Sequence, residues 1–137
     1  MKLSEMRTSL AKARGWGSAK SGTSHFIWQR ITALLLIPLT LWFVSSLMKL
    51  AVSADPQIVA EWLDSGFHAG ALILMLLALF YHAALGLQVI IEDYIHCPAM
   101  KYTALLANAV IMLAFAIISV LAVLKLHLHL FALGGAG

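Results

Sequence analysis

The fold is decided by residues 69–91, AGALILMLLALFYHAALGLQVII, a run that contains no Asp, Glu, Lys or Arg. A membrane-spanning helix needs about 20 mostly apolar residues, so this run is long enough to cross a bilayer. Its one histidine, His82, is about 14 Å along the helix axis from Ile91, at about 1.5 Å per residue, and therefore near the middle of the membrane. Lipid offers an imidazole no hydrogen-bond partner, so His82 is a candidate functional residue.

Two further stretches are long enough to span a membrane, one between Arg30 and Lys49 and one between Lys101 and Lys125. Of the 137 residues, 62% are hydrophobic and 11% are charged, whereas a soluble domain has about 25% charged residues. We therefore predict an all-α membrane protein with three transmembrane helices and a single domain. Its apolar surface suits lipid or other subunits, and we expect no nucleic-acid partner.

The distribution of charges predicts how the chain crosses the membrane. Residues 1–30 carry six lysines and arginines, whereas residues 51–67 carry three acidic residues and no basic one. By the positive-inside rule, the N-terminus is cytoplasmic and the first loop is periplasmic. The first 22 residues lack the apolar core of a signal peptide, so we expect a retained tail and a multi-pass protein of the bacterial inner membrane.

The predicted segments alternate between membrane and solvent, with a short helix expected after Pro56, a residue that suits the first turn of a helix. They are a cytoplasmic tail at 1–24, helices at 25–50, 68–94 and 102–127, a periplasmic loop at 51–67, a cytoplasmic loop at 95–101 and a periplasmic tail at 128–137.

One face of the second span gathers the candidate residues. At about 100° per residue, His82, Gly86, Val89 and Asp93 fall on the same side of the helix. Gly86 lies one turn beyond His82, and its missing side chain would let a heme or a closely packed helix approach. Imidazole is a common axial ligand of heme iron, and it also forms hydrogen bonds between membrane helices. By itself, His82 fits either role.

A heme held by two histidines would need a second ligand, and the chain offers no other histidine at the depth of His82. His25 and His68 lie near the ends of spans, and His127 and His129 lie beyond the third. The second ligand would therefore come from another chain. The lone cysteine excludes an intrachain disulfide and a CxxC metal or heme-attachment motif.

The second span ends on Glu92, Asp93 and Tyr94. A helix C-terminus prefers cations, so two carboxylates there indicate either simple solvation or a function. The Tyr94 hydroxyl could hydrogen-bond a carbonyl, although an interfacial aromatic anchor would look the same.

On the same side, Arg30 could reach lipid phosphate or pair with a carboxylate such as a heme propionate. In the third span, Asn108 is expected to hydrogen-bond another helix.

Over nearly its whole length, the chain resembles the smaller hydrophobic membrane anchor subunits of succinate dehydrogenase (respiratory complex II). Two segments carry the resemblance: Gly17-Ser18-Ala19-Lys20-Ser21-Gly22-Thr23 followed by His25-Phe26-Ile27-Trp28-Gln29-Arg30, and His82 through Gly86 and Gln88 to Asp93-Tyr94. The spacing from the histidine to the aspartate–tyrosine pair is the specific part. At Ser24 and His25 the match is less exact, so the role of His25 stays open.

The resemblance implies a role for each residue. His82 would be an axial iron ligand of heme b, with the second ligand supplied by the partner anchor of the same complex, its other hydrophobic subunit. Arg30 would lie near the heme propionates, and Gly86 would give the heme room. Tyr94 would hydrogen-bond ubiquinone, with Asp93 as its acidic neighbour. Succinate oxidation, FAD and the iron–sulfur clusters would belong to the flavoprotein and iron–sulfur subunits on the cytoplasmic face.

Two other functions remain open at this point. One is a purely structural anchor without heme, in which His82 only bonds a neighbouring helix. The other is the anchor of a fumarate reductase, which has the same architecture and the opposite physiological direction. A transporter fits poorly, because three helices without an inverted repeat offer little pathway.

Overall fold

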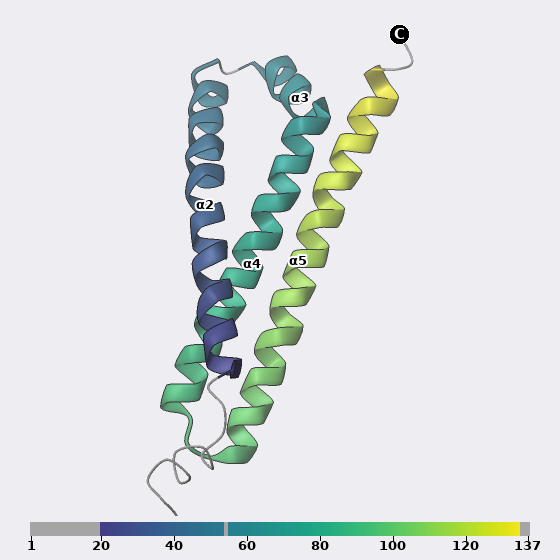
Figure 1. The fold of residues 1–137 in the computed structure, drawn as a ribbon. Helices are drawn as coiled ribbons and strands as arrows, with labels where there is room; N and C mark the ends of the chain where they lie inside the picture. Colours follow the sequence, from purple (N-terminus) through teal and green to yellow (C-terminus); the bar gives the residue numbers. More distant parts are fainter. Residues whose placement is uncertain (1–19, 54, 135–137) are drawn as a thin grey trace, which may run out of the picture.

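The computed structural model describes residues 20–53 and 55–134, which form three long helices and one short helix (Figure 1). The helices are α2 (Lys20–Ser53), α3 (Pro56–Asp64), α4 (Gly66–Tyr94) and α5 (Pro98–Gly134). Three of them are long and apolar enough to cross a membrane, over Thr23–Ser53, Gly66–Tyr94 and Pro98–Leu130. The prediction of an all-α membrane protein with three spans is therefore confirmed. Gly17 to Ala19, which open the first segment of the family resemblance, lie outside the described residues.

The helices are longer than the sequence predicted. α5 begins at Pro98, so the connection from α4 is shorter than the predicted loop at 95–101. Proline suits this position, because the first helical turn needs no backbone N–H from it. α5 then continues to Gly134, so most of the tail predicted at 128–137 is helical. Residues 126–133 contain no glycine or proline that would break the helix.

The short helix predicted after Pro56 is present as α3. The carboxylate of Asp55 caps it by accepting a hydrogen bond from the backbone N–H of Gln57 at 2.8 Å. Pro56 follows in the first turn, where its fixed φ favours the helix.

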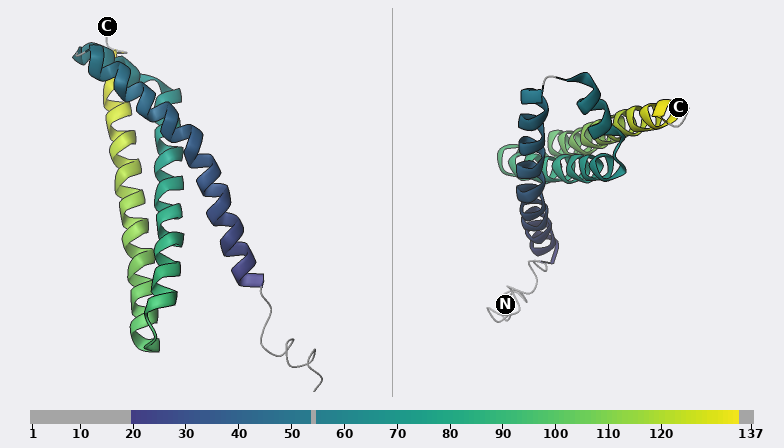
Figure 2. Two further views of the ribbon diagram at one scale, coloured as in Figure 1. Left: turned by 90° about the vertical axis from the view of Figure 1, so that its left-hand side faces the viewer. Right: turned by 90° about the horizontal axis from the view of Figure 1, so that it is seen from above.

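α4 is the central helix. It packs against both α2 and α5, whereas α2 and α5 make no backbone contact within the described residues. α4 and α5 run side by side as an antiparallel pair, and α2 crosses this pair so that its N-terminal end diverges from it (Figure 2). We call the end of the bundle that carries α3 the α3 end, and the end with the α4–α5 connection the turn end (Figure 1).

The buried apolar core is small and lies almost wholly on α4. Its side chains in the described chain are Ala69, Leu72, Met75, Ala78, Leu85 and Ala116, all but the last on α4. Many large apolar side chains on all three long helices remain exposed. A monomeric soluble protein rarely exposes so much apolar surface, so lipid or other subunits must cover it.

An aromatic cluster fastens α3 at its end of the bundle. Trp62 of α3 stacks on His68 of α4, with ring centroids 4.6 Å apart, and on Trp42 of α2 at 5.8 Å. Nδ1 of His68 lies 2.8 Å from the carbonyl oxygen of Trp62 and can donate to it. α5 also contacts α3 here, because Nδ1 of its His127 lies 3.1 Å from the carbonyl oxygen of Leu63. Both histidines therefore have packing roles at the α3 end.

Candidate functional site

His82 meets α2 through Thr32. Oγ1 of Thr32 lies 2.9 Å from Nδ1 of His82, although the two residues are 50 positions apart in the sequence. Thr32 is only 6% exposed. The hydrogen bond between helices that the sequence allowed for His82 is therefore present.

The hydroxyl of Thr32 has two further neighbours, the carbonyl oxygens of Trp28 at 2.9 Å and Gln29 at 3.1 Å. A hydroxyl has one hydrogen to donate, and a carbonyl oxygen can only accept. All three contacts can be hydrogen bonds if Thr32 donates to the carbonyl oxygens of its own helix and accepts from Nδ1–H of His82. In that tautomer, Nε2 of His82 carries no hydrogen and presents a lone pair.

The side chain of Gln29 covers this second nitrogen. Nε2 of Gln29 lies 3.5 Å from Nε2 of His82 and can donate a long hydrogen bond to it. A Cβ atom built on Gly86 would lie 3.7 Å from the same amide nitrogen, an ordinary van der Waals contact. Gln29 therefore occupies the space between His82 and Gly86. Its Oε1 is buried and has no hydrogen-bond partner among the described residues.

Three polar residues of α2 share the stripe that faces α4. His25, Gln29 and Thr32 are spaced at i, i+4 and i+7, which puts them on one side of a helix. Nε2 of His25 is buried and, within the part of the chain that the structure describes, has no hydrogen-bond partner. The sequence analysis missed Gln29 and Thr32. The signal that could have found them was this polar periodicity at the start of an apolar span.

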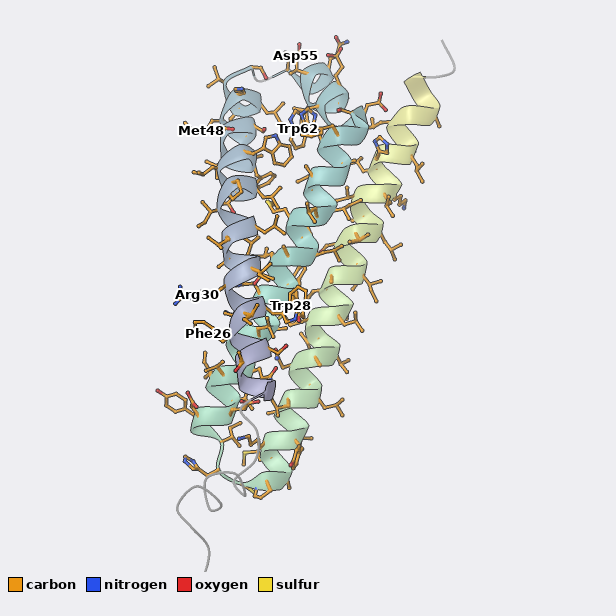
Figure 3. All side chains as sticks on the ribbon, in the orientation of Figure 1. Phe26, Trp28, Arg30, Met48, Asp55 and Trp62 are labelled. Atoms are coloured by element: carbon orange, nitrogen blue, oxygen red, sulfur yellow. The ribbon has the colours of Figure 1, made fainter. Side chains whose placement is uncertain are left out.

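Arg30 does not lie beside His82 in this structure. Its guanidinium lies 5.0 Å from the centre of the Phe26 ring, and both residues point away from α4 and α5 (Figure 3). Trp28, in contrast, is on the α4 side, where its ring meets that of Tyr81 edge-on at 6.2 Å. A carboxylate paired with Arg30 would therefore lie outside the three-helix bundle.

Asp93 and Tyr94 end α4 at the turn end, about 17 Å from His82 along the axis at about 1.5 Å per residue. Both are exposed, Tyr94 by 80%. Glu92 is engaged locally, because its carboxylate accepts from Gln88 at 2.8 Å and its carbonyl accepts from Lys101 at 3.1 Å. Lys101 thus supplies the cation that a helix C-terminus prefers. All three side chains are exposed, and of the three only that of Glu92 makes a hydrogen bond among the described residues.

Asn108 joins α5 to α4, as predicted. Its Nδ2 donates to the carbonyl oxygen of Ala84 at 2.9 Å, while its Oδ1 is buried without a partner among the described residues. It lines a cavity of about 490 Å³ between these helices, together with Tyr81 and Gln88. The cavity is otherwise mostly apolar, and His82 is not part of its lining.

The described residues contain no group of three or more His, Cys, Asp or Glu side chains that could hold a metal ion. A multi-ligand metal site is therefore not formed within residues 20–53 and 55–134. What this part of the chain offers is a single imidazole nitrogen beside a glycine, at the depth where α2 and α4 cross.

Known proteins resemble this chain over most of its length. Residues 4–123 match the family described as succinate dehydrogenase/fumarate reductase transmembrane subunit. The chain is 36% identical over 103 residues to the succinate dehydrogenase hydrophobic membrane anchor subunit of Rickettsia bellii (strain RML369-C), covering 75% of this chain and 82% of that protein.

Two further relatives bear similar descriptions. The succinate dehydrogenase hydrophobic membrane anchor subunit of Rickettsia conorii (strain ATCC VR-613 / Malish 7) is 31% identical over 119 residues, which cover 86% of this chain and 90% of that protein. The succinate dehydrogenase membrane anchor subunit of Reclinomonas americana is 31% identical over 80 residues, covering 56% and 66%. Together with the three apolar helices, these matches show that the chain belongs to the family of succinate dehydrogenase/fumarate reductase transmembrane subunits, as a hydrophobic membrane anchor subunit of succinate dehydrogenase.

Proposed function

We propose that Nε2 of His82 would bind the iron of a heme b, which this anchor would hold together with the partner anchor, the other hydrophobic subunit of the complex. The observation that carries the proposal is the hydrogen bond between Thr32 and Nδ1 of His82. This bond favours the tautomer whose Nε2 has a free lone pair, and neutral imidazole nitrogen is a usual ligand of heme iron.

The residues around His82 fit such a group. Gly86 leaves space one turn along α4, and the side chain that fills this space, Gln29, has a buried oxygen without a partner among the described residues. Among the described residues, the one hydrogen bond of the glutamine amide is this long 3.5 Å contact, so the flexible side chain can be displaced at little cost. When bound, a heme supplies one-electron redox chemistry. Of this chain's own residues, His82 would bind the iron, and Arg30, which faces out of the three-helix bundle, would pair with a propionate.

We further propose that Asp93 and Tyr94 form part of a ubiquinone-reducing site at the turn end. Reduction of a quinone to a quinol takes two electrons and two protons, and the electrons would come from an iron–sulfur subunit that docks at this end. The Tyr94 hydroxyl would donate a hydrogen bond to one quinone carbonyl, and both protons would come from the cytoplasm, delivered to the quinone oxygens through Asp93. Both side chains are exposed in this chain, so other subunits would complete the walls of the site.

The remaining features suit a place within a larger assembly. The exposed apolar faces of the three long helices would be covered by lipid and by the partner anchor. The turn end would face the cytoplasm, where the iron–sulfur and flavoprotein subunits would carry the clusters, the FAD and succinate oxidation. The membrane would be the bacterial inner membrane, with the N-terminus in the cytoplasm and the C-terminus in the periplasm.

The test is a reduced-minus-oxidised absorption spectrum of the complex purified through this chain. A b-type band is expected in the wild type, and it should be lost or shifted in His82→Leu. His129→Leu, which changes an exposed histidine of α5, should leave it unchanged. Co-purified flavoprotein and iron–sulfur subunits would support the assembly. A wild-type complex without the band would favour the heme-free anchor, in which His82 only bonds Thr32.

The direction of the reaction needs a separate measurement, since the family includes fumarate reductase subunits. Faster succinate–quinone than quinol–fumarate turnover by the purified complex would support a succinate dehydrogenase. The reverse ratio would favour the fumarate reductase.

A further inference from the structure

We propose that Thr32 is the positioning residue of the heme ligand: it holds Nδ1 of His82 so that Nε2 points its lone pair at the iron. This inference rests on the proposed heme-binding function of His82. It assigns to the first helix a role that is distinct from the pairing of Arg30 with a propionate.

The number of hydrogens available around Thr32 indicates which group donates in the hydrogen bond between Thr32 and His82. If the hydroxyl donated to Nδ1, its oxygen would face two carbonyl oxygens at 2.9 and 3.1 Å with no hydrogen between them. Nε2 of His82 would then carry the hydrogen and point it at the amide nitrogen of Gln29, 3.5 Å away. Both conflicts disappear when Nδ1–H donates to Thr32.

A hydrogen-bond acceptor such as Thr32 affects both how tightly the histidine binds the metal and the redox potential of that metal. A histidine that binds a metal usually donates its other N–H to a fixed acceptor, which sets the ring orientation and makes the ligand more electron-rich. An electron-rich ligand stabilises ferric over ferrous iron, so losing the acceptor should raise the midpoint potential of the heme. Loss of such a partner typically lowers metal affinity about 10- to 100-fold.

Gln29 provides an internal contrast, because it touches the opposite nitrogen of the same ring. The iron would take the position that its amide covers, so a heme-bound His82 gains nothing from Gln29. Removing the amide should therefore spare heme binding, whereas removing the Thr32 hydroxyl should not. Both residues lie on the α4-facing stripe of α2, so a general loosening of the helix contact would affect both variants.

The experiment compares four variants in the complete complex: Thr32→Val, Thr32→Ser, Gln29→Leu and Thr40→Val. Valine matches threonine in shape and lacks the acceptor, serine restores the acceptor, and Thr40 is an exposed threonine of the same helix. The readouts are the transfer of heme to excess apomyoglobin and the midpoint potential from a redox titration of the b-type band. We expect Thr32→Val to lose heme about 10- to 100-fold more readily, with a raised potential, and the other three to resemble the wild type.

Two results would overturn the role of Thr32. One is a Thr32→Val complex with wild-type heme retention and potential. The other is an equal loss in Gln29→Leu, which would mean that helix packing, and not the acceptor, is what matters. A wild-type complex without heme would instead refute the proposed function. In that case the ¹⁵N spectrum of histidine-labelled complex, assigned with His82→Leu, still tests Thr32, since an unchanged tautomer signal in Thr32→Val would refute its hold on the ring.

Discussion

Thr32 and His82 meet at 2.9 Å where two membrane helices cross. The contact fastens α2 to α4, and it also favours the tautomer in which Nε2 of the imidazole carries no hydrogen. A single buried hydroxyl therefore joins the packing of the anchor to the chemistry that we propose for it.

Replacing Tyr94 by Phe should slow quinone reduction at least about fivefold, because a lost hydrogen bond is worth about 1 kcal/mol. Succinate oxidation by an artificial acceptor should not change, because that reaction would not use the turn end of the anchor. Steady-state assays with both acceptors measure the two rates. Tyr102→Phe, at another exposed tyrosine near the same end, is the matched control. Equal quinone rates in wild type and Tyr94→Phe would exclude Tyr94 from the site.

Replacing Asp93 by Asn should lower quinone turnover about 100-fold, the typical contribution of a general acid or base. Asparagine has nearly the same shape and does not deliver the proton. Glu92→Gln should have little effect, because Glu92 already accepts a local hydrogen bond from Gln88 and glutamine can still accept one. A similar loss in both variants would point to the charge of this helix end and not to proton delivery by Asp93.

Replacing Gly86 by Ala separates the packing of the chain from the space for heme. The added Cβ would meet Gln29 at an ordinary 3.7 Å, so the anchor should assemble at wild-type levels. The heme-to-flavin ratio of the purified complex should fall, because the added methyl group would narrow the space that we propose for the heme. Gly70→Ala serves as the control, since a Cβ there has nothing within 4 Å. A full heme content in Gly86→Ala would show that the heme does not approach this glycine.

Replacing Trp62 by Ala should destabilise the α3 end without altering the heme. Two stacked ring contacts are lost, with Trp42 and His68, each worth about 0.5–1.5 kcal/mol beyond the buried area. Thermal denaturation of the purified complex should shift to lower temperature, and α3 should become more sensitive to protease. The b-type band should keep its position. A changed band would mean that the aromatic cluster and the heme site are coupled.

The sequence predicted the three spans well because lipid imposes one strong rule: a long apolar run must become a helix that satisfies its own backbone. It also located His82 and Gly86 on one face of the second span. It predicted the helix ends less well, since α5 starts at Pro98 and runs on to Gly134. Lys101 and Lys125, between which the third span was predicted, both lie inside α5.

The partners of His82 could not be read from the second span, because they come from another helix 50 or more residues away. The direction in which Arg30 points could not be read from the sequence either. Arg30 lies between Gln29 and Thr32, which contact His82, yet its position on the helix turns it outward to Phe26. To predict how two helices pack, one must know which face of each contacts the other. In an apolar sequence, only a few polar residues, such as Gln29 and Thr32, indicate that face.

The central position of α4 has a consequence for how the anchor is made. Of the three long helices, α2 leaves the ribosome first, yet its main neighbour, α4, follows only after α3. α4 and α5, in contrast, are joined by residues 95–97 alone and can pair as soon as both are inserted. We therefore expect a hairpin of the last two helices to form while the first is still alone in lipid. The crossing of α2 over α4 would then be completed late in biogenesis, and the prosthetic group would enter after that step.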